Sequence, residues 1–118
     1  MTRPRHPRSE VGAGSILALA IVAVAVTVAL AMVGLGAGLV ARQRTIAAAD
    51  AAALAAADVL LGAAPGDPCE VARAVAEGNG ATLERCELDG YVVTVMTGSW
   101  VVGAPIVAQS TAGPESAR

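Results

Sequence analysis

The chain opens with an apolar segment in which hydrophobic positions are continuous rather than periodic. No charged residue occurs from Val11 to Ala41, and the densest apolar stretch covers Ile16 to Val33. A helix over that run would extend roughly 46 Å at about 1.5 Å per residue, against a bilayer hydrocarbon thickness of about 30 Å. The pattern predicts a transmembrane helix over residues 11–41, which either tilts or leaves the bilayer before its apolar run ends.

A cleavable secretory signal is the alternative for this segment. Such a signal has an apolar region of about 7–15 residues that ends in a small-residue cleavage site. Ala18-Leu19-Ala20 would pass as a cleavage triplet, but it comes early and more apolar sequence follows it. The length of the run therefore favours a retained anchor.

Arginine placement predicts the orientation of this anchor. Arg3, Arg5 and Arg8 precede the apolar run, whereas Arg42 and Arg44 follow it. The positive-inside rule favours a cytoplasmic basic N-terminus over residues 1–10 and an extracytoplasmic C-terminus. We expect a single-pass protein of the cell membrane.

Beyond the anchor, an alanine-rich stretch without Gly or Pro predicts a helical extension over residues 42–62. At 100° per residue one face collects most of its larger apolar side chains: Ile46, Ala53, Leu54, Ala57, Leu60 and Leu61. Asp50 falls within that face, where a carboxylate is costly unless it is paired or solvated. It either stays in water or meets a positive group, which would be Arg73 or a neighbouring subunit.

A small α+β domain is predicted over residues 63–108. Gly62 to Gly66 ends the long helix, and Asp67 with Pro68 has the pattern of an N-cap followed by proline at the first helical position. A short helix should then run from Pro68 to Glu77 and end at Gly78-Asn79-Gly80.

The remaining pattern is typical of strands. Asp89-Gly90 between β-prone runs predicts a type I′ hairpin whose register pairs Leu88 with Tyr91, Cys86 with Val93 and Glu84 with Val95. Cys86, Leu88, Tyr91, Val93 and Val95 would share the buried face. A third strand is expected from Trp100 to Val107, interrupted by Gly103 and Pro105, with a disordered tail over residues 109–118. The fold class is therefore α+β, with the short helix packed on a small antiparallel sheet.

Cys69 and Cys86 are the two cysteines of the chain. An even count in a segment expected outside the cytoplasm favours a disulfide, which would stabilise so small a domain by about 3 kcal/mol. Free buried thiols are the alternative. The spacing is not C-x-x-C, and with His6 in the N-terminal tail there is no nearby histidine to complete a zinc site.

Composition removes most other functions. Hydrophobic residues make up 55% of the chain but aromatic residues only 2%, and the net charge is −2 with scattered arginines. Nucleic-acid binding lacks a basic patch with interleaved aromatic residues. A hydrolytic triad lacks its histidine, and no phosphate-binding glycine loop follows a strand. We expect no enzyme activity, no cofactor, no metal and no small-molecule substrate.

Gly34 and Gly38 form a G-x-x-x-G spacing near the end of the apolar run. This spacing lets two helix backbones approach closely in lipid, so the pair is a candidate helix-packing face. Because glycine also costs about 1 kcal/mol relative to alanine inside a helix, the same residues could instead loosen it.

Three segments give the chain a resemblance to a known family. They are Glu10-Val11-Gly12-Ala13-Gly14-Ser15-Ile16-Leu17-Ala18-Leu19-Ala20, the stretch from Ala41-Arg42-Gln43-Arg44 through Asp50 to Ala55, and Asp67-Pro68-Cys69 followed by Asn79-Gly80-Ala81 and Cys86-Glu87-Leu88-Asp89-Gly90. Across roughly residues 9–97 the chain resembles TadE/TadG-like pseudopilins of the tight-adherence (Flp) pilus machinery, in particular the short actinobacterial TadE-like proteins.

The resemblance implies a membrane-inserted subunit that helps to initiate or assemble a pilus or a pilus-like secretion filament. Its partners would be other pilin-like or Tad-machinery membrane subunits and the lipid bilayer. Gly12 and Gly14 are the possible processing positions. Pilin-type precursors carry a glutamate five residues into the mature chain, where this sequence has Leu17 or Leu19. The alternative is a stand-alone envelope protein whose outer domain binds an unrelated partner.

Overall fold

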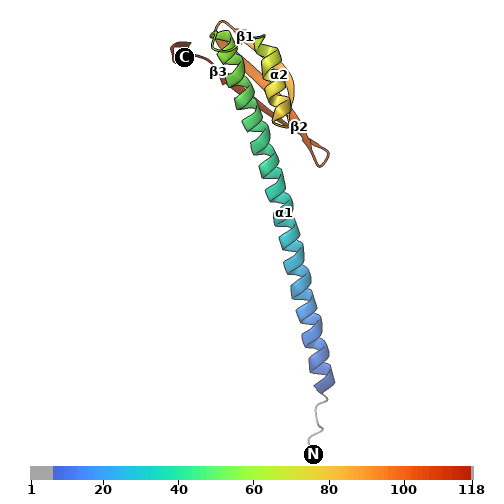
Figure 1. The fold of residues 1–118 in the computed structure, drawn as a ribbon. Coiled ribbons are helices and arrows are strands. Elements are labelled where there is room, and N and C mark those ends of the chain that lie inside the picture. The colour runs from blue at the N-terminus through green and yellow to red at the C-terminus, as the bar shows by residue number, and fades with distance from the viewer. Residues whose placement is uncertain (1–6, 118) are drawn as a thin grey trace, which may run out of the picture. The chain divides into compact units, whose positions relative to one another are not determined.

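The computed structural model describes residues 7–117, so Arg3, Arg5 and most of the expected basic N-terminus lie outside the described residues. In chain order the elements are helix α1 (Pro7–Leu60), helix α2 (Pro68–Gly78), strands β1 (Thr82–Asp89), β2 (Val92–Val101) and β3 (Ala104–Ala112), and a short 3₁₀ helix η1 (Glu115–Ala117) (Figure 1). The predicted α+β class, with a long N-terminal helix and a small antiparallel sheet, is confirmed.

The chain divides into two compact units, Met1–Ala37 and Gly38–Arg118. The boundary falls inside α1, so the alanine-rich end of that helix belongs to the same unit as α2 and the sheet. The predicted helical extension and the predicted small domain are therefore parts of one unit. We call the unit from Gly38 onward the C-terminal domain.

In the first unit, α1 has no charged side chain on any side from Gly12 to Ala37. Its large side chains, from Ile16 to Leu35, are exposed. The helix is long and apolar enough to cross a membrane, with a mean hydropathy of 3.0 over its most apolar window and none of that window buried. In water such a surface would be unfavourable, because apolar area that stays exposed forgoes roughly 25 cal/mol per Å².

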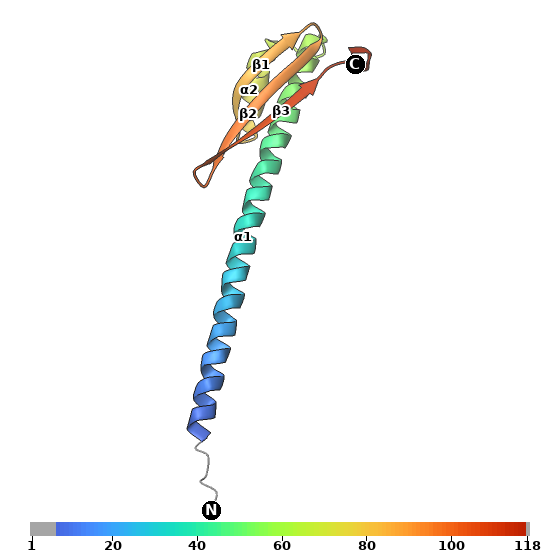
Figure 2. The ribbon, with the colours of Figure 1, turned by 180° about the vertical axis from the view of Figure 1, so that it is seen from behind.

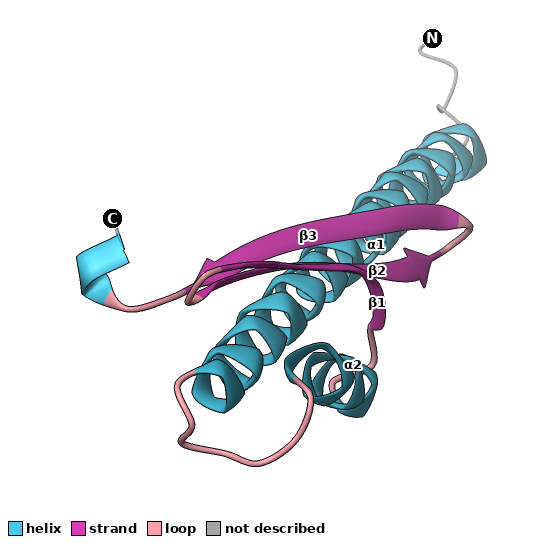
Figure 3. Cartoon of the chain, turned by 90° about the horizontal axis from the view of Figure 1, so that it is seen from above, coloured by secondary structure: helices cyan, strands magenta, loops and turns pink. Residues whose placement is uncertain are grey.

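In the C-terminal domain, three antiparallel strands form a sheet in the order β1-β2-β3. The end of α1 and all of α2 cover one face of this sheet (Figure 3). Helix α2 begins and ends within one residue of the predicted bounds, because Asp67 caps its first amides and Gly80, with φ of +78°, lets the chain turn after it.

The first hairpin differs from its predicted register by two residues. Leu88 pairs with Val93 and Cys86 with Val95, so the two-residue turn is Gly90-Tyr91 rather than Asp89-Gly90. Only Gly90 has a positive φ, which is the φ pattern of a type II′ turn with glycine first. Because the shift is even, Cys86, Leu88, Val93 and Val95 still share one face. Tyr91 leaves that face for the exposed turn.

The second hairpin and the tail also differ from prediction. Trp100 belongs to β2, and β3 begins at Ala104 after a turn at Val102-Gly103, both with positive φ. Residues 109–112, predicted as disordered tail, are strand: Gln109 to Ala112 pair with Met96 to Val93. A central strand as long as β2 offers hydrogen-bonding partners to this short polar segment, so pairing overrides its weak propensity.

The core of the C-terminal domain is built largely from alanine. The buried cluster joins alanines of α1 and α2 to the sheet through Ala49, Ala52, Ala53, Ala56, Ala57, Ala72, Ala76, Val93, Val95 and Ala108. The predicted inner face of α1 was only partly right: Ala53 and Ala57 are buried, but Leu54 and Leu61 are exposed. Alanines let the helix lie closer to the sheet than leucines would. Because successive helical residues are rotated by about 100°, Leu54 points away from the sheet when Ala53 faces it.

Candidate functional site

The disulfide joins the start of α2 to the middle of β1. Cys69 and Cys86 are bonded, with their Cα atoms 5.8 Å apart, as the sequence predicted. Both cysteines are half-buried, and Cys86 packs against the alanine core. Because so few large side chains are buried here, closing this loop is expected to supply a large share of the stability of the domain.

A second brace, which the sequence analysis missed, is made of hydroxyl groups between α1 and β2. Thr45 and Thr97 are buried; the Thr97 hydroxyl donates to the Thr45 carbonyl oxygen at 3.1 Å, and Thr45 Oγ1 also hydrogen bonds with Ser99 Oγ. Thr45 Oγ1 is also 3.0 Å from the Ala41 carbonyl oxygen. The sequence signal that could have predicted the buried Thr97 is its spacing, because Val93, Val95 and Thr97 occupy alternate positions of one strand.

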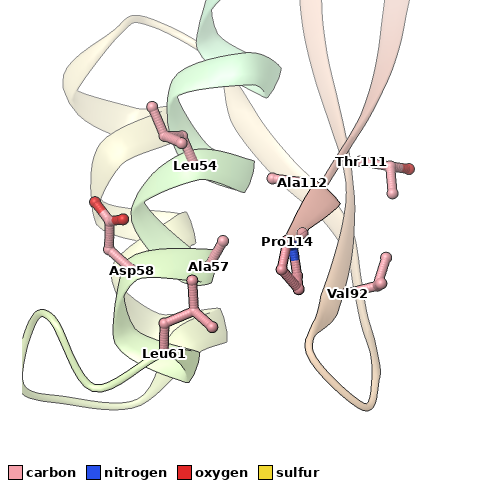
Figure 4. Close-up of a pocket in the computed structure, with 9 residues that line it drawn as sticks. Leu54, Ala57, Asp58, Leu61, Val92, Thr111, Ala112 and Pro114 are labelled. Atoms are coloured by element: carbon pink, nitrogen blue, oxygen red, sulfur yellow. The ribbon is translucent and has the colours of Figure 1, made fainter. Parts of the chain in front are cut away.

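A pocket lies between the C-terminal end of α1 and the sheet, at the other end of their contact from Thr45 and Thr97. Its volume is about 300 Å³. One wall is formed by Leu54, Ala57 and Asp58 of α1 with Leu61 directly after it, and the other wall by Val92, Thr111, Ala112, Gly113 and Pro114 (Figure 4). Asp58 supplies the one charged group of the lining, at the rim of an otherwise largely apolar cleft. Such a lining suits an apolar side chain better than a charged ligand.

Asp50, the possible inter-subunit charge, lies on the exposed side of α1. Among residues 7–117 no ion pair joins it to Arg73; the ion pair found there is Arg85–Glu87 at 3.8 Å, between two exposed side chains. Of the two interpretations given for Asp50 within one chain, pairing with Arg73 is wrong. Contact with a neighbouring subunit stays a prediction.

Neither glycine of the G-x-x-x-G pair is required by the fold of the single chain. A Cβ atom added at Gly34 or Gly38 would meet no other atom within 4 Å, and the same is true of Gly36. The possible processing residues Gly12 and Gly14 lie within α1 and also have open space around them. Their roles stay predictions.

Side chains that could bind a metal ion do not cluster within residues 7–117. Among the residues that the structure describes, no group of three or more His, Cys, Asp or Glu side chains could hold a metal ion.

Comparison with known proteins adds no relative from which a role could be transferred. No protein-family model, no curated protein and no solved structure matches the chain.

Proposed function

We propose that this chain is a membrane-anchored, pseudopilin-like structural or assembly subunit of a Tad (Flp)-type pilus or secretion apparatus. The observation that supports it most is the apolar, exposed surface of α1 from Gly12 to Ala37. This surface can be covered only by lipid or by other apolar helices. A subunit that packs side by side with other helices in the membrane, and carries a small domain outside it, would have such an apolar helix followed by a folded domain.

The anchor crosses the membrane once, with the N-terminus in the cytoplasm and the C-terminal domain outside. Two independent features support this orientation. Arg3, Arg5 and Arg8 precede the apolar run, and the Cys69–Cys86 disulfide is a bond of oxidising compartments. A reporter fused after residue 118, active only outside the cytoplasm, tests it; a cytosolic C-terminus would contradict it.

Helix–helix packing through Gly34 and Gly38 carries the assembly in this proposal. Both residues are glycine without any need for it in the isolated chain, whereas close approach of two helix backbones in lipid does need it. Gly36 lies about 200° around the helix from Gly34 and is equally unconfined.

The matched experiment replaces these glycines in the full-length protein in its native membrane. Gly34→Leu with Gly38→Leu should abolish cross-linking to, and co-purification with, other membrane subunits of the apparatus. Gly34→Leu alone should already weaken both, whereas Gly36→Leu should leave both intact, because it adds the same single side chain on a different face. Recovery of the unsubstituted protein as a lone monomer would refute the assembly role.

Processing at Gly12 or Gly14 is a separate part of the proposal. Mass spectrometry of the protein from native membranes would find a mature start at Ala13 or Ser15 if a prepilin-type peptidase acts on it. An intact N-terminus means a permanent anchor, and the protein would then assist assembly without being processed as a pilin.

The pocket favours a second candidate function, a stand-alone envelope protein whose outer domain binds an unrelated partner. A largely apolar cleft of about 300 Å³ at the distal end of the domain is large enough for one bulky side chain. Leu54→Arg would add a positive charge to the lining of the pocket while leaving the helix face at Gly34 unchanged. If Leu54→Arg removes a partner that the Gly34/Gly38 substitutions retain, the second candidate is favoured.

A further inference from the structure

The turn between β2 and β3 carries apolar side chains that nothing in the domain covers. Val102 is 99% exposed, and Trp100 is 76% exposed two residues earlier. Val101 and Ala104 form the last pair of the hairpin, so Val102 and Gly103 are the two turn residues. We call residues 100–105 the apolar tip.

Val102 is unfavourable at this position for the fold alone. It has a φ of +51°, a conformation in which a β-branched residue is rare and strained. Two-residue turns of this type favour Asn or Gly at the first position. A domain whose core is mostly alanine has little stability to spare, so an exposed, strained valine here points to a role outside the fold.

Charge separates this hairpin from the rest of the domain. From Gly90 to Pro114 the sequence contains no charged residue. The other edge strand, β1, carries Glu84, Arg85, Glu87 and Asp89. Burial of the β2–β3 hairpin in a medium of low polarity would therefore desolvate no charge, whereas burial of β1 would desolvate several.

The tip lies at the end of the domain that is joined to the apolar part of α1. Thr45 contacts Ser99, so the tip is about 10 Å further along β2, at about 3.3 Å per residue. From Thr45 to Gly38, where α1 leaves the domain, the helix also rises about 10 Å. Within the domain, Figure 2 shows the β2–β3 turn at this end of the sheet and the β1–β2 turn at the other.

The same end of the domain carries two cations. Arg42 and Arg44 are exposed on α1, one turn or less before Thr45. Tryptophan and arginine are the side chains that suit a lipid headgroup region, the first with its ring at the acyl boundary and the second on phosphate groups.

We propose that the apolar tip inserts into the headgroup interface of the bilayer, as a second membrane contact beside the helix anchor. Trp100 and Val102 would enter the interface while Arg42 and Arg44 bind lipid phosphates, which would hold the domain against the membrane at two points. The proposal rests on the membrane anchor of the proposed function, and not on its role in a pilus.

Trp100 is the one tryptophan of the chain, so its fluorescence reports the tip alone. The full-length protein is reconstituted in vesicles of phosphatidylcholine and phosphatidylglycerol, with or without phosphatidylcholine brominated on its upper acyl carbons. We expect brominated lipid to lower Trp100 emission about twofold and lipid to protect Trp100 from aqueous acrylamide.

A matched control moves the probe to the other end of the sheet. Tyr91 is 63% exposed in the β1–β2 turn, so Tyr91→Trp in a Trp100→Phe background should be quenched by acrylamide and not by brominated lipid. Val102→Asn separates the fold from the membrane contact, because it should stabilise the turn and yet weaken quenching of Trp100 by brominated lipid.

Flotation of the vesicles distinguishes failure of this inference from failure of the anchor. If the protein floats with the vesicles and brominated lipid leaves Trp100 emission unchanged, the tip is not in the interface and the inference is overturned. If the protein does not float, the anchor and the inference fall together. Protection of Trp100 from acrylamide without quenching by brominated lipid would overturn the inference in favour of contact with a second protein chain.

Discussion

Val24 and Leu54 lie on the same helix, and their side chains are almost equally exposed, at 64% and 62%. Their neighbours differ completely. Around Val24 no side chain is charged and none is buried, whereas Leu54 lies on the outer side of a helix whose inner alanines pack on a sheet. Equal exposure therefore has two meanings: a whole circumference without cover requires an apolar medium, and one leucine beside a packed face does not.

The two regions also use alanine differently. Before Gly38, alanine is one apolar residue among many on an unburied helix. After Gly38, the alanines at positions 49, 52, 53 and 56 set how closely the helix approaches the sheet. Membrane insertion of the first region should tolerate changes of size but not of charge, and folding of the second should tolerate changes of charge on its surface but not of size in its core.

The largest difference is expected from the same charge in both regions. Val24→Arg should raise the free energy of membrane insertion by about 2.5–3.5 kcal/mol, because arginine near the centre of a spanning helix is costly. Leu54→Arg should change the stability of the C-terminal domain by less than about 0.5 kcal/mol, as is usual for surface sites. Carbonate extraction of membranes measures the first and denaturant unfolding of the detergent-solubilised chain the second. Equal effects of the two substitutions would remove the basis of the comparison.

Loss of the disulfide should affect one region alone. Cys69→Ala with Cys86→Ala is expected to destabilise the C-terminal domain by about 3 kcal/mol while the protein stays in the membrane fraction. Hydrogen exchange of the β2 amides should report the loss of protection. The contrary result would be unchanged protection in β2, which would mean that the alanine core holds the domain without its covalent brace.

Replacing alanine by leucine should be unfavourable for folding in the second region and favourable for membrane insertion in the first. Ala52→Leu adds bulk where no space is left and should cost about 1–3 kcal/mol of domain stability. Ala25→Leu, on the exposed part of α1, should favour insertion by a few tenths of a kcal/mol, roughly the leucine value on the insertion scale. Unfolding and insertion assays on the two variants would check the sign, and a neutral Ala52→Leu would mean that the helix can move away from the sheet.

The smallest effect concerns the cap of α2. Asp67 accepts hydrogen bonds from the amides of Cys69 and Glu70, both at 3.0 Å, so Asp67→Ala should cost about 1 kcal/mol. Asp50→Ala is the matched control, because Asp50 is exposed and makes no ion pair within residues 7–117. Equal melting shifts for the two variants would show that the cap contributes nothing. A loss at Asp50 only in native membranes would support its contact with a neighbouring subunit.

Prediction from sequence succeeded where local structure depends on a few neighbouring residues. Asp67-Pro68 began α2 as predicted, and the even spacing of Val93 and Val95 placed both on the buried face. Prediction failed where two local structures suit the same residues equally well. The hairpin turned at Gly90-Tyr91 because a type II′ turn also accepts glycine first, and the register moved by two residues without changing the face.

The inner face of α1 shows why packing could not be read from hydrophobicity. Leucines at positions 54 and 61 have more apolar area than any alanine near them, so they were expected inside. In the folded domain, close approach of helix and sheet is decided by the smallest side chains, and the leucines border the pocket instead. The Thr45–Thr97 brace depends on the same approach, since it joins segments far apart in the sequence.

By itself, the sequence determined that an uninterrupted apolar helix precedes a small domain with two cysteines, because continuous hydrophobicity, helix caps and turn residues act over short distances. The tertiary structure alone decided that the domain packs on alanine, that residues 109–112 complete the sheet, and that Trp100 and Val102 project from one end of it. Those outcomes depend on contacts between segments that are dozens of residues apart in the sequence. The free energy of such a contact depends on both segments, so neither segment predicts it alone.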